Sequence, residues 1–235
     1  MDFPLRMPDV SACKGLAAIA LGMSALTACG SEPNETSPAP SDTSPSTSRT
    51  NTTTPGAPPG AKVLGTPRKG QPFTLTTTYT DTPEPTKLQI TVTSVTCGKP
   101  LDKSVLAYAA SSIGTSTPTP KPESGKQYCV VVLDTVNIGN REIIWDTTDT
   151  VSLNVGATRY TQSQDDANHA GDYGQYLASK GRTGPSFGLN PGSKGPAPGV
   201  FQIPAGSTPS TLWVTSGTAI ETIDGIEPGY LVKLS

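Results

Sequence analysis

Apolar and polar residues alternate with a period of two along much of this chain, which predicts β-strands rather than helices. The segment Leu88–Val92 has one apolar and one polar face. Val95 and Cys97 continue the apolar face, but one residue out of phase. A β-bulge near Thr93-Ser94 accounts for this shift, because a bulge inserts one extra residue into a strand.

The segment Tyr128–Leu133 is apolar without interruption, which is typical of a central strand that is buried on both faces. Other segments also have the composition of strands, and turns rich in Gly, Pro and Asn separate them: Phe73–Tyr79, Ile143–Trp145, Val151–Val155, Val200–Ile203, Thr211–Val214 and Tyr230–Leu234. We find no long helical pattern between them. This order predicts an all-β fold, an antiparallel β-sandwich.

The composition agrees with a strand-rich fold. The chain has 24 Gly and 24 Pro among 235 residues, and only 15% of its residues are charged. This excess of turn formers disfavours a helical bundle. The formal net charge is -2 and the 17 Lys and Arg residues are scattered, so we expect no nucleic-acid partner.

The N-terminus has the three parts of a secretory signal peptide, which we assign to residues 1–28. Arg6 and Lys14 supply the positive charge, and the apolar stretch Gly15–Leu26 follows. This stretch is shorter than the ~20 apolar residues that a membrane-spanning helix needs. Translation from Met7 would preserve the pattern, so either start predicts export.

The sequence Leu26-Thr27-Ala28-Cys29 has the order of a bacterial lipobox. It predicts cleavage between Ala28 and Cys29 and a lipid on the Cys29 sulfur, which would anchor the chain at the extracytoplasmic face of the cell membrane. The alternative is ordinary signal-peptidase cleavage after Ala28, since small residues precede that bond as well. In that case the exported chain would leave the membrane.

Residues 29–60 are rich in Ser, Thr and Pro and have no apolar face to bury, which predicts a disordered tether. As a random coil, about 30 such residues reach roughly 30 Å, and as a polyproline helix they reach about 90 Å. We therefore predict a folded domain over residues 61–235 that the tether holds away from the lipid surface.

The cysteines favour one disulfide. Cys13 leaves with the signal peptide and Cys29 takes the lipid, so Cys97 and Cys129 remain to meet an oxidising exterior. A bond between them would close a loop of about 30 residues and add about 3–4 kcal/mol of stability in the chain-entropy model. The alternatives are two free buried thiols, or a redox or metal pair. The lack of a C-x-x-C motif or of a histidine at metal-ligand spacing disfavours the latter.

Several segments of the predicted domain resemble the DUF4352 family: Val132–Gly139, Val151–Tyr160, Leu189–Gly192 and Gly199–Pro204. The resemblance covers residues 87–214. This family, sometimes called telokin-like, occurs in bacterial and especially actinobacterial lipoproteins. The resemblance implies an immunoglobulin-like sandwich, and it brings no catalytic residues to carry over.

The tryptophans separate this chain from antibody-type domains. Those domains place a Trp between the two cysteines of their disulfide, whereas Trp145 and Trp213 both follow Cys129. The resemblance is therefore to the sandwich architecture. The segment Gly98–Gly125 is also long for a connection between strands, and we predict disorder in its Pro-rich second half.

Carboxylates surround the only histidine of the chain, His169, in the segment Asp165–Tyr173. An EF-hand starting at Asp166 would need an oxygen ligand at Ala170 and a Glu at Leu177, so we favour a solvated polar loop over a metal site. A hydrolase built on His169 is the other alternative, although the many serines of the chain make a chance proximity of serine and histidine easy. We expect no catalytic residue, no metal and no cofactor.

Tyr160, Tyr173 and Tyr176 lie near His169 in the sequence and form a candidate binding loop with it. Exposed tyrosines are common in recognition surfaces. They would equally suit the end of the sandwich core. The leading hypothesis is a non-enzymatic binding module at the cell surface, whose partner is a wall polymer or another exported protein. The alternative is an extracytoplasmic hydrolase or metal-dependent enzyme that uses His169.

Overall fold

The fold was analysed in a computed structural model, which describes residues 54–77, 84–114, 119–217 and 227–235. Arg49–Ser235 forms one compact unit. The predicted signal peptide, Cys29 and the tether up to residue 53 lie outside the described residues. From residue 54 onward the chain contacts the folded unit, since the Gly56 carbonyl accepts a hydrogen bond from Asn154 Nδ2 at 2.9 Å.

The strands form two sheets, as the alternating pattern predicts. The four-stranded sheet has the order β2-β3-β4-β7 and is antiparallel throughout, with β2 Phe73–Thr77, β3 Thr86–Cys97, β4 Lys126–Asn137 and β7 Lys194–Pro204. The five-stranded sheet has the order β1-β9-β8-β5-β6, with β1 Val63–Gly65, β9 Gly229–Lys233, β8 Thr211–Thr215, β5 Val151–Val155 and β6 Thr158–Tyr160. Its β1–β9 pair is parallel, and its other pairs are antiparallel.

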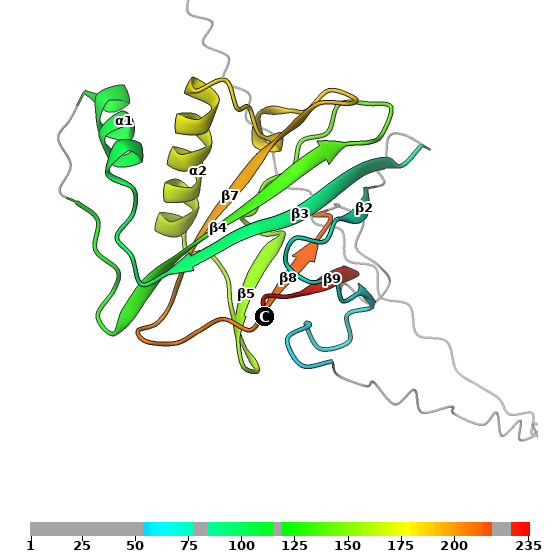
Figure 1. Ribbon diagram of the computed structural model, residues 1–235, viewed down its shortest axis with the longest axis horizontal. Helices are drawn as coiled ribbons and strands as arrows, with labels where there is room; N and C mark the ends of the chain where they lie inside the picture. The colour runs from blue at the N-terminus through cyan, green and yellow to red at the C-terminus, as the bar shows by residue number, and fades with distance from the viewer. Residues whose placement is uncertain (1–53, 78–83, 115–118, 218–226) are drawn as a thin grey trace, which may run out of the picture. The chain divides into compact units, whose positions relative to one another are not determined.

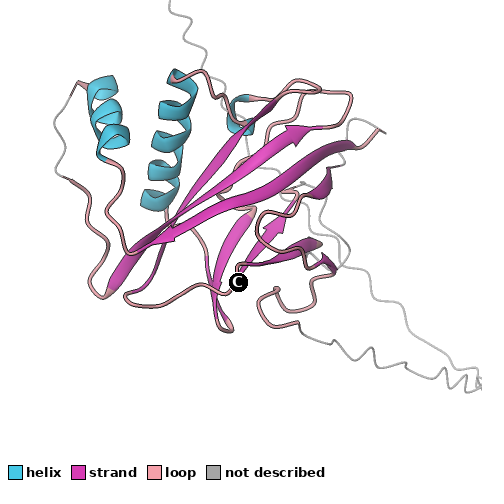
Figure 2. Cartoon of the chain, in the orientation of Figure 1, coloured by secondary structure: helices cyan, strands magenta, loops and turns pink. Residues whose placement is uncertain are grey.

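The prediction of an all-β fold is wrong in one respect, because two α-helices are present. They are α1 Lys103–Ile113 and α2 Gln164–Ser179, and a short 3₁₀ helix spans Pro185–Phe187. The two α-helices lie side by side (Figure 1), with α2 packed against β7 of the four-stranded sheet, and Figure 2 shows both helices on one side of the strands. The fold is therefore a mostly-β, sandwich-like pair of sheets with a helical layer on one of them. No helix among the described residues is long and apolar enough to span a membrane.

β4 is the central strand predicted from its uninterrupted apolar sequence. Cys129, Val131 and Leu133 face the main core between the two sheets. Tyr128 and Val130 point the other way, into a second apolar cluster that contains Ala170 of α2. The helical layer is what buries the second face of this strand. An all-β arrangement would have left that face without a cover.

The predicted bulge in β3 is confirmed. The register of β3 against β4 shifts between Val92 and Ser94, so Thr93 is the extra residue. The Thr93 hydroxyl donates a hydrogen bond to the Val132 carbonyl at 2.9 Å. The bulge restores the inward direction of the residues beyond it, because Val95 and Cys97 both pack against the main core.

Two strand predictions need correction. β7 begins at Lys194, well before the predicted Val200, and it contains Pro196 and Pro198. Proline fits there because β7 is an edge strand that pairs with β4 alone. The predicted strand Ile143–Trp145 is wrong, since only Ile143 forms an isolated bridge, with Leu189.

α1 occupies the first half of the long connection from Gly98 to Gly125. Asp102 caps its N-terminus by accepting a hydrogen bond from the Ser104 N–H at 2.7 Å. Gly114 ends the helix in the left-handed conformation, with φ of 68°, which glycine adopts without steric cost. The Pro-rich half has no helix or strand in its described part, residues 119–125, and residues 115–118 lie outside the description.

α2 replaces the polar loop predicted around His169. Ser163 and Asp166 form a capping box, in which the Asp166 N–H donates to Ser163 Oγ at 3.2 Å and the Ser163 N–H donates to Asp166 Oδ2 at 3.1 Å. Asp166 also accepts a hydrogen bond at 2.9 Å from Gln202 Nε2 of β7. The Gln202 Oε1 atom in turn accepts the N–H of Glu123 at 2.7 Å. One buried carboxylate thus starts the helix and attaches it to the sheet.

We expect Asp166→Ala to lower the free energy of unfolding by about 2–3 kcal/mol, because it removes a helix cap and leaves the buried Gln202 amide without its acceptor. The matched control is Asp165→Ala, one residue away on the exposed face of the same helix turn. It removes only a charge near the helix N-terminus, which contributes about 0.3–1 kcal/mol. Chemical denaturation of both variants measures the difference. Equal losses in the two variants would show that the Asp166 network does not attach α2.

Candidate functional site

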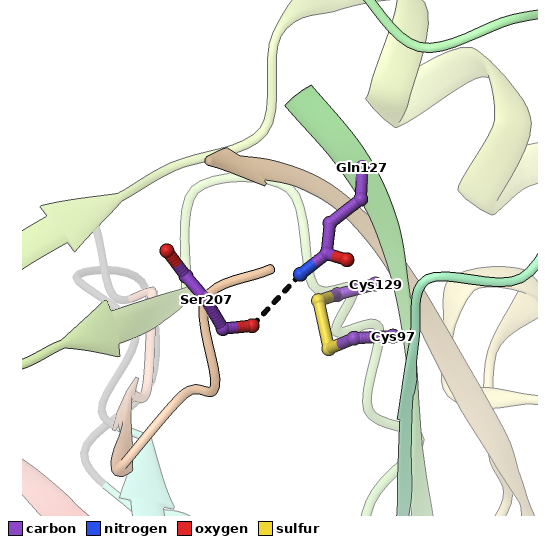
Figure 3. The surroundings of a disulfide bond; sticks show 4 residues. All are labelled: Cys97, Gln127, Cys129 and Ser207. Atoms are coloured by element: carbon purple, nitrogen blue, oxygen red, sulfur yellow. Dashed lines mark hydrogen bonds between the residues drawn. A yellow bond between two sulfur atoms is a disulfide. The ribbon is translucent and has the colours of Figure 1, made fainter. Parts of the chain in front are cut away.

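The predicted disulfide between Cys97 and Cys129 is present (Figure 3). The two cysteines are directly opposite each other on β3 and β4, with their Cα atoms 4.0 Å apart. Beside them, Gln127 Nε2 donates a hydrogen bond to the Ser207 carbonyl at 2.7 Å. Disulfides form and persist in oxidising compartments, so the bond indicates an extracytoplasmic location. It also closes the base of the segment that carries α1.

His169 lies on α2, and its surroundings differ from those of a catalytic base. Its ring packs edge-on against Tyr128, with 6.1 Å between the centroids. Its Nδ1 atom is 3.6 Å from Asp172 Oδ2, which is beyond hydrogen-bond distance. In the described part of the chain, no hydrogen bond joins His169 to a serine, and no group of three or more His, Cys, Asp or Glu side chains could hold a metal ion. A hydrolase needs its nucleophile and base in contact, and these residues are not so arranged.

The tyrosines of the predicted binding loop pack against other parts of the fold, and only Tyr160 contacts the sandwich core, as the alternative expected. Tyr160 lies on β6 and packs against the main core. Tyr173 and Tyr176 lie on α2 beside α1: the Tyr173 hydroxyl accepts the N–H of Asp102 at 2.8 Å, and the Tyr176 ring is 5.9 Å from that of Tyr108. Tyr160 thus lies on β6, whereas His169, Tyr173 and Tyr176 lie on α2 and not in a loop.

The two tyrosines in the apolar cluster beneath the helices stay protonated well above neutral pH. Burial raises the pKa of Tyr128, and the carboxylates of Asp166 and Asp165 raise it further. Burial also raises the pKa of Tyr173, although the hydrogen bond from the Asp102 N–H acts in the opposite direction. Neither phenol is prepared to act as a base at neutral pH, which agrees with a packing role.

A groove on the outer face of the five-stranded sheet is the strongest candidate site. In β5 and β8, Val151, Leu153, Leu212 and Val214 point into the main core, and the residues between them point outward. Ser152 and Trp213 are outward-facing partners in this register. They line a cavity of about 530 Å³, called here the outer groove. This volume lies within the ~300–1,000 Å³ that is typical of small-ligand sites.

The floor of the outer groove is buried although it lies outside the sandwich. Ser152 is 4% exposed, and its Oγ atom has no hydrogen-bond partner among the described residues. The Oγ atom exposes less than 1 Å², so the hydroxyl itself is closed off from the outer groove. Trp213 beside it is also 4% exposed. A Cβ at Gly229 would come within 2.6 Å of Trp213 Cζ2, so the β9 backbone packs directly against the indole.

Charged side chains form the rim of the outer groove. Arg159 projects from β6, and Asp149 lies just before β5; both are exposed. Glu227 lines the groove from the start of the C-terminal segment, and its carboxylate accepts the N–H of Gly217 at 3.1 Å. Pro58, at the end of the predicted tether, forms another part of the wall. Among the described residues, the charged side chains that line the groove are thus Arg159, Asp149 and Glu227.

Sequence reasoning missed this site, although part of the signal was present. The alternation in Val151–Val155 and Thr211–Val214 shows which residues face outward. It does not show that Ser152 and Trp213 come to lie side by side, because their pairing joins segments about sixty residues apart in the sequence. The sequence prediction expected recognition by tyrosines in an exposed loop near His169, and it therefore named other residues.

Comparisons with known proteins found distant structural similarity and no sequence family. No family model and no curated protein matches the chain, so the DUF4352 resemblance stays a prediction. Among solved structures, the chain is similar to the yjhA protein of Bacillus subtilis, at 18% identity over 72% of this chain and 99% of that one, with a TM-score of 0.39. It is also similar to an uncharacterized β-sandwich protein of Clostridium difficile 630, at 15% identity over 74% and 96% of the two chains, with a TM-score of 0.35. These similarities are too distant to assign a family or a function.

Proposed function

We propose that this chain is a lipoprotein, anchored through Cys29 at the extracytoplasmic face of the cell membrane, and that its folded domain is a non-enzymatic binding module. The lipobox, the Ser/Thr/Pro-rich tether and the disulfide support this location together, because each belongs to an exported chain. A rigid sandwich on a long tether suits the presentation of a binding surface to the space outside the membrane.

The outer groove is the binding surface in this proposal, and the observation that carries it is a cavity of about 530 Å³ with Arg159, Asp149 and Glu227 on its rim. The charged rim would orient the ligand over this floor. By contrast, no contact of His169 favours the alternative of a hydrolase.

A co-sedimentation assay tests the proposed function. The chain carrying Cys29→Ala, which has no site for the lipid, is incubated with isolated cell-envelope fragments, and the bound fraction is measured against concentration. We expect saturable binding that Arg159→Ala weakens several-fold, because Arg159 stands on the rim of the outer groove. The matched control is Arg141→Ala, an exposed arginine outside the groove. The proposal fails if the envelope binds no chain saturably, or if both arginine variants bind like the parent.

A further inference from the structure

We infer that a second groove, close to the Cys97–Cys129 disulfide, binds a linear polyanion. This groove, called here the lysine groove, has a volume of about 440 Å³, which lies within the ~300–1,000 Å³ typical of ligand sites. Residues 98–100, residues 119–122 and the first part of β4 line it. It shares no lining residue with the outer groove, so the inference goes beyond the proposed function and does not depend on it.

Three lysines line the groove, and two of their ammonium groups are available to a ligand. Lys99 and Lys121 are exposed, and neither has an ion pair within the described part of the chain. Lys126 is exposed as well, but its Nζ atom pairs with the Glu123 carboxylate at 2.8 Å. Lys99 and Lys121 therefore supply the charge that attracts a ligand.

The surroundings of these lysines preserve their positive charge. No acidic residue in the described ranges lines the lysine groove, and Glu123 beside it is engaged by Lys126. Residues 115–118, which precede one lining segment and lie outside the description, are Thr-Ser-Thr-Pro and carry no charge. The net charge of the whole chain is -2, so the cluster is not part of a generally basic surface. A positively charged groove of this kind favours an anionic ligand.

The segments that line the groove are held in place, although residues 98–100 and 119–122 form neither helix nor strand. Gly98 directly follows a disulfide-bonded cysteine, and its N–H donates to the Tyr128 carbonyl at 3.0 Å. Residues 119–122 lead into Glu123, whose N–H donates to Gln202 Oε1 at 2.7 Å. Proline restricts the backbone further at three lining positions, Pro100, Pro120 and Pro122. A groove that is ordered before binding loses less conformational entropy when a ligand enters.

The number and type of the cationic groups favour a polymer over a single anion. The three lysines come from three separate stretches of the chain and line one elongated series of segments, which suits several anionic groups in succession. A lysine ammonium acts as a point charge without the planar fork of arginine, so it accepts phosphate and carboxylate oxygens alike. The shared chemistry of the ligand is thus a chain of repeated oxyanions.

An anionic membrane surface is the competing class of partner, and the groove disfavours it. Proteins that lie on a bilayer bury apolar side chains at the boundary between headgroups and acyl chains. The large apolar side chains that are exposed in the described chain all lie outside the lysine groove: Leu64, Ile138, Ile144 and Phe187. Concave shape and charge without such side chains suit a polymer chain.

Titration calorimetry with defined ligands tests the inference. The chain carrying Cys29→Ala is titrated with polyphosphate, with polyglutamate and with phosphatidylglycerol vesicles. We expect saturable binding of a polyanion whose affinity falls about tenfold between 50 and 200 mM salt, because two to three lysines displace counterions from it. The stronger of the two polymers identifies the oxyanion as phosphate or carboxylate.

A pair of double variants locates the binding. Lys99→Gln/Lys121→Gln should weaken polyanion binding about tenfold and reduce its dependence on salt. The matched control, Lys62→Gln/Lys87→Gln, removes the same charge from two exposed positions outside the groove and should bind like the parent. Thermal unfolding should be the same in both, since all four side chains are exposed.

Three results would overturn the inference: binding of neither polymer, binding of the vesicles alone, or equal losses of affinity in the two double variants. Each is distinguishable from a failure of the proposed function. Both double variants keep Arg159 and the other described residues of the outer groove, so envelope binding that depends on Arg159 is measured separately.

Discussion

Loss of the Cys97–Cys129 disulfide is expected to lower the free energy of unfolding by about 3–4 kcal/mol. The bond joins residues 32 positions apart in the sequence, so it restricts the unfolded chain substantially. In the folded protein it fastens the ends of β3 and β4 where the α1-bearing segment leaves and returns. Its removal therefore affects the four-stranded sheet and the attachment of the helical layer together.

Denaturant unfolding with and without a reductant measures this loss. The parent should show a lower midpoint in the reductant, and the melting temperature should fall by about 10 °C for a domain of this size. The double variant Cys97→Ala/Cys129→Ala should match the reduced parent and should not respond to the reductant. An unchanged midpoint in the reduced parent would mean that the disulfide contributes nothing to stability.

The strands could be predicted because their residues carry a local signal. Alternation located β3, β5 and β8, and the apolar sequence of β4 predicted burial on both faces. The N-terminal half of β7 was missed because Pro196 and Pro198 argue against a strand in general. They are tolerated because β7 is at the edge of its sheet, which is a property of the whole topology.

The helices were missed for a different reason. α2 contains Gly171, Gly174 and several Asp and Asn residues, all of which have low helix propensity. Its signal is a capping box, Ser163 with Asp166, followed by apolar positions at Ala170, Tyr173 and Leu177. That spacing matches one face of a helix. The tertiary contacts with β7 compensate for the weak propensity, and the sequence does not show them.

The candidate site depends still more on tertiary structure. The alternation shows that Ser152 and Trp213 each face outward from their strands. It does not show that both side chains become buried. The end of the predicted tether also reaches this sheet, since the Gly56 carbonyl accepts a hydrogen bond from Asn154 of β5 and Pro58 lines the outer groove. A segment whose composition predicts disorder thus helps to shape the site.

Cys29→Ala is expected to abolish retention at the membrane. A lipid contributes about 0.8 kcal/mol per buried CH₂ group, and stable anchoring takes about two chains. All of this free energy would act through one sulfur atom and the new N-terminus beside it. Because the whole predicted anchor acts through this one residue, the effect should be close to all-or-none, unlike the graded effects expected in the outer groove.

Cell fractionation of the parent and the Cys29→Ala variant is the most direct test of an anchored, extracytoplasmic module. Labelled palmitate should enter the parent and not the variant, and the parent should sediment with membranes until detergent is added. The variant should appear in the released fraction after cleavage at Ala28, with its disulfide formed. A parent that takes up no lipid, or a variant that stays with the membrane after cleavage, would contradict the account.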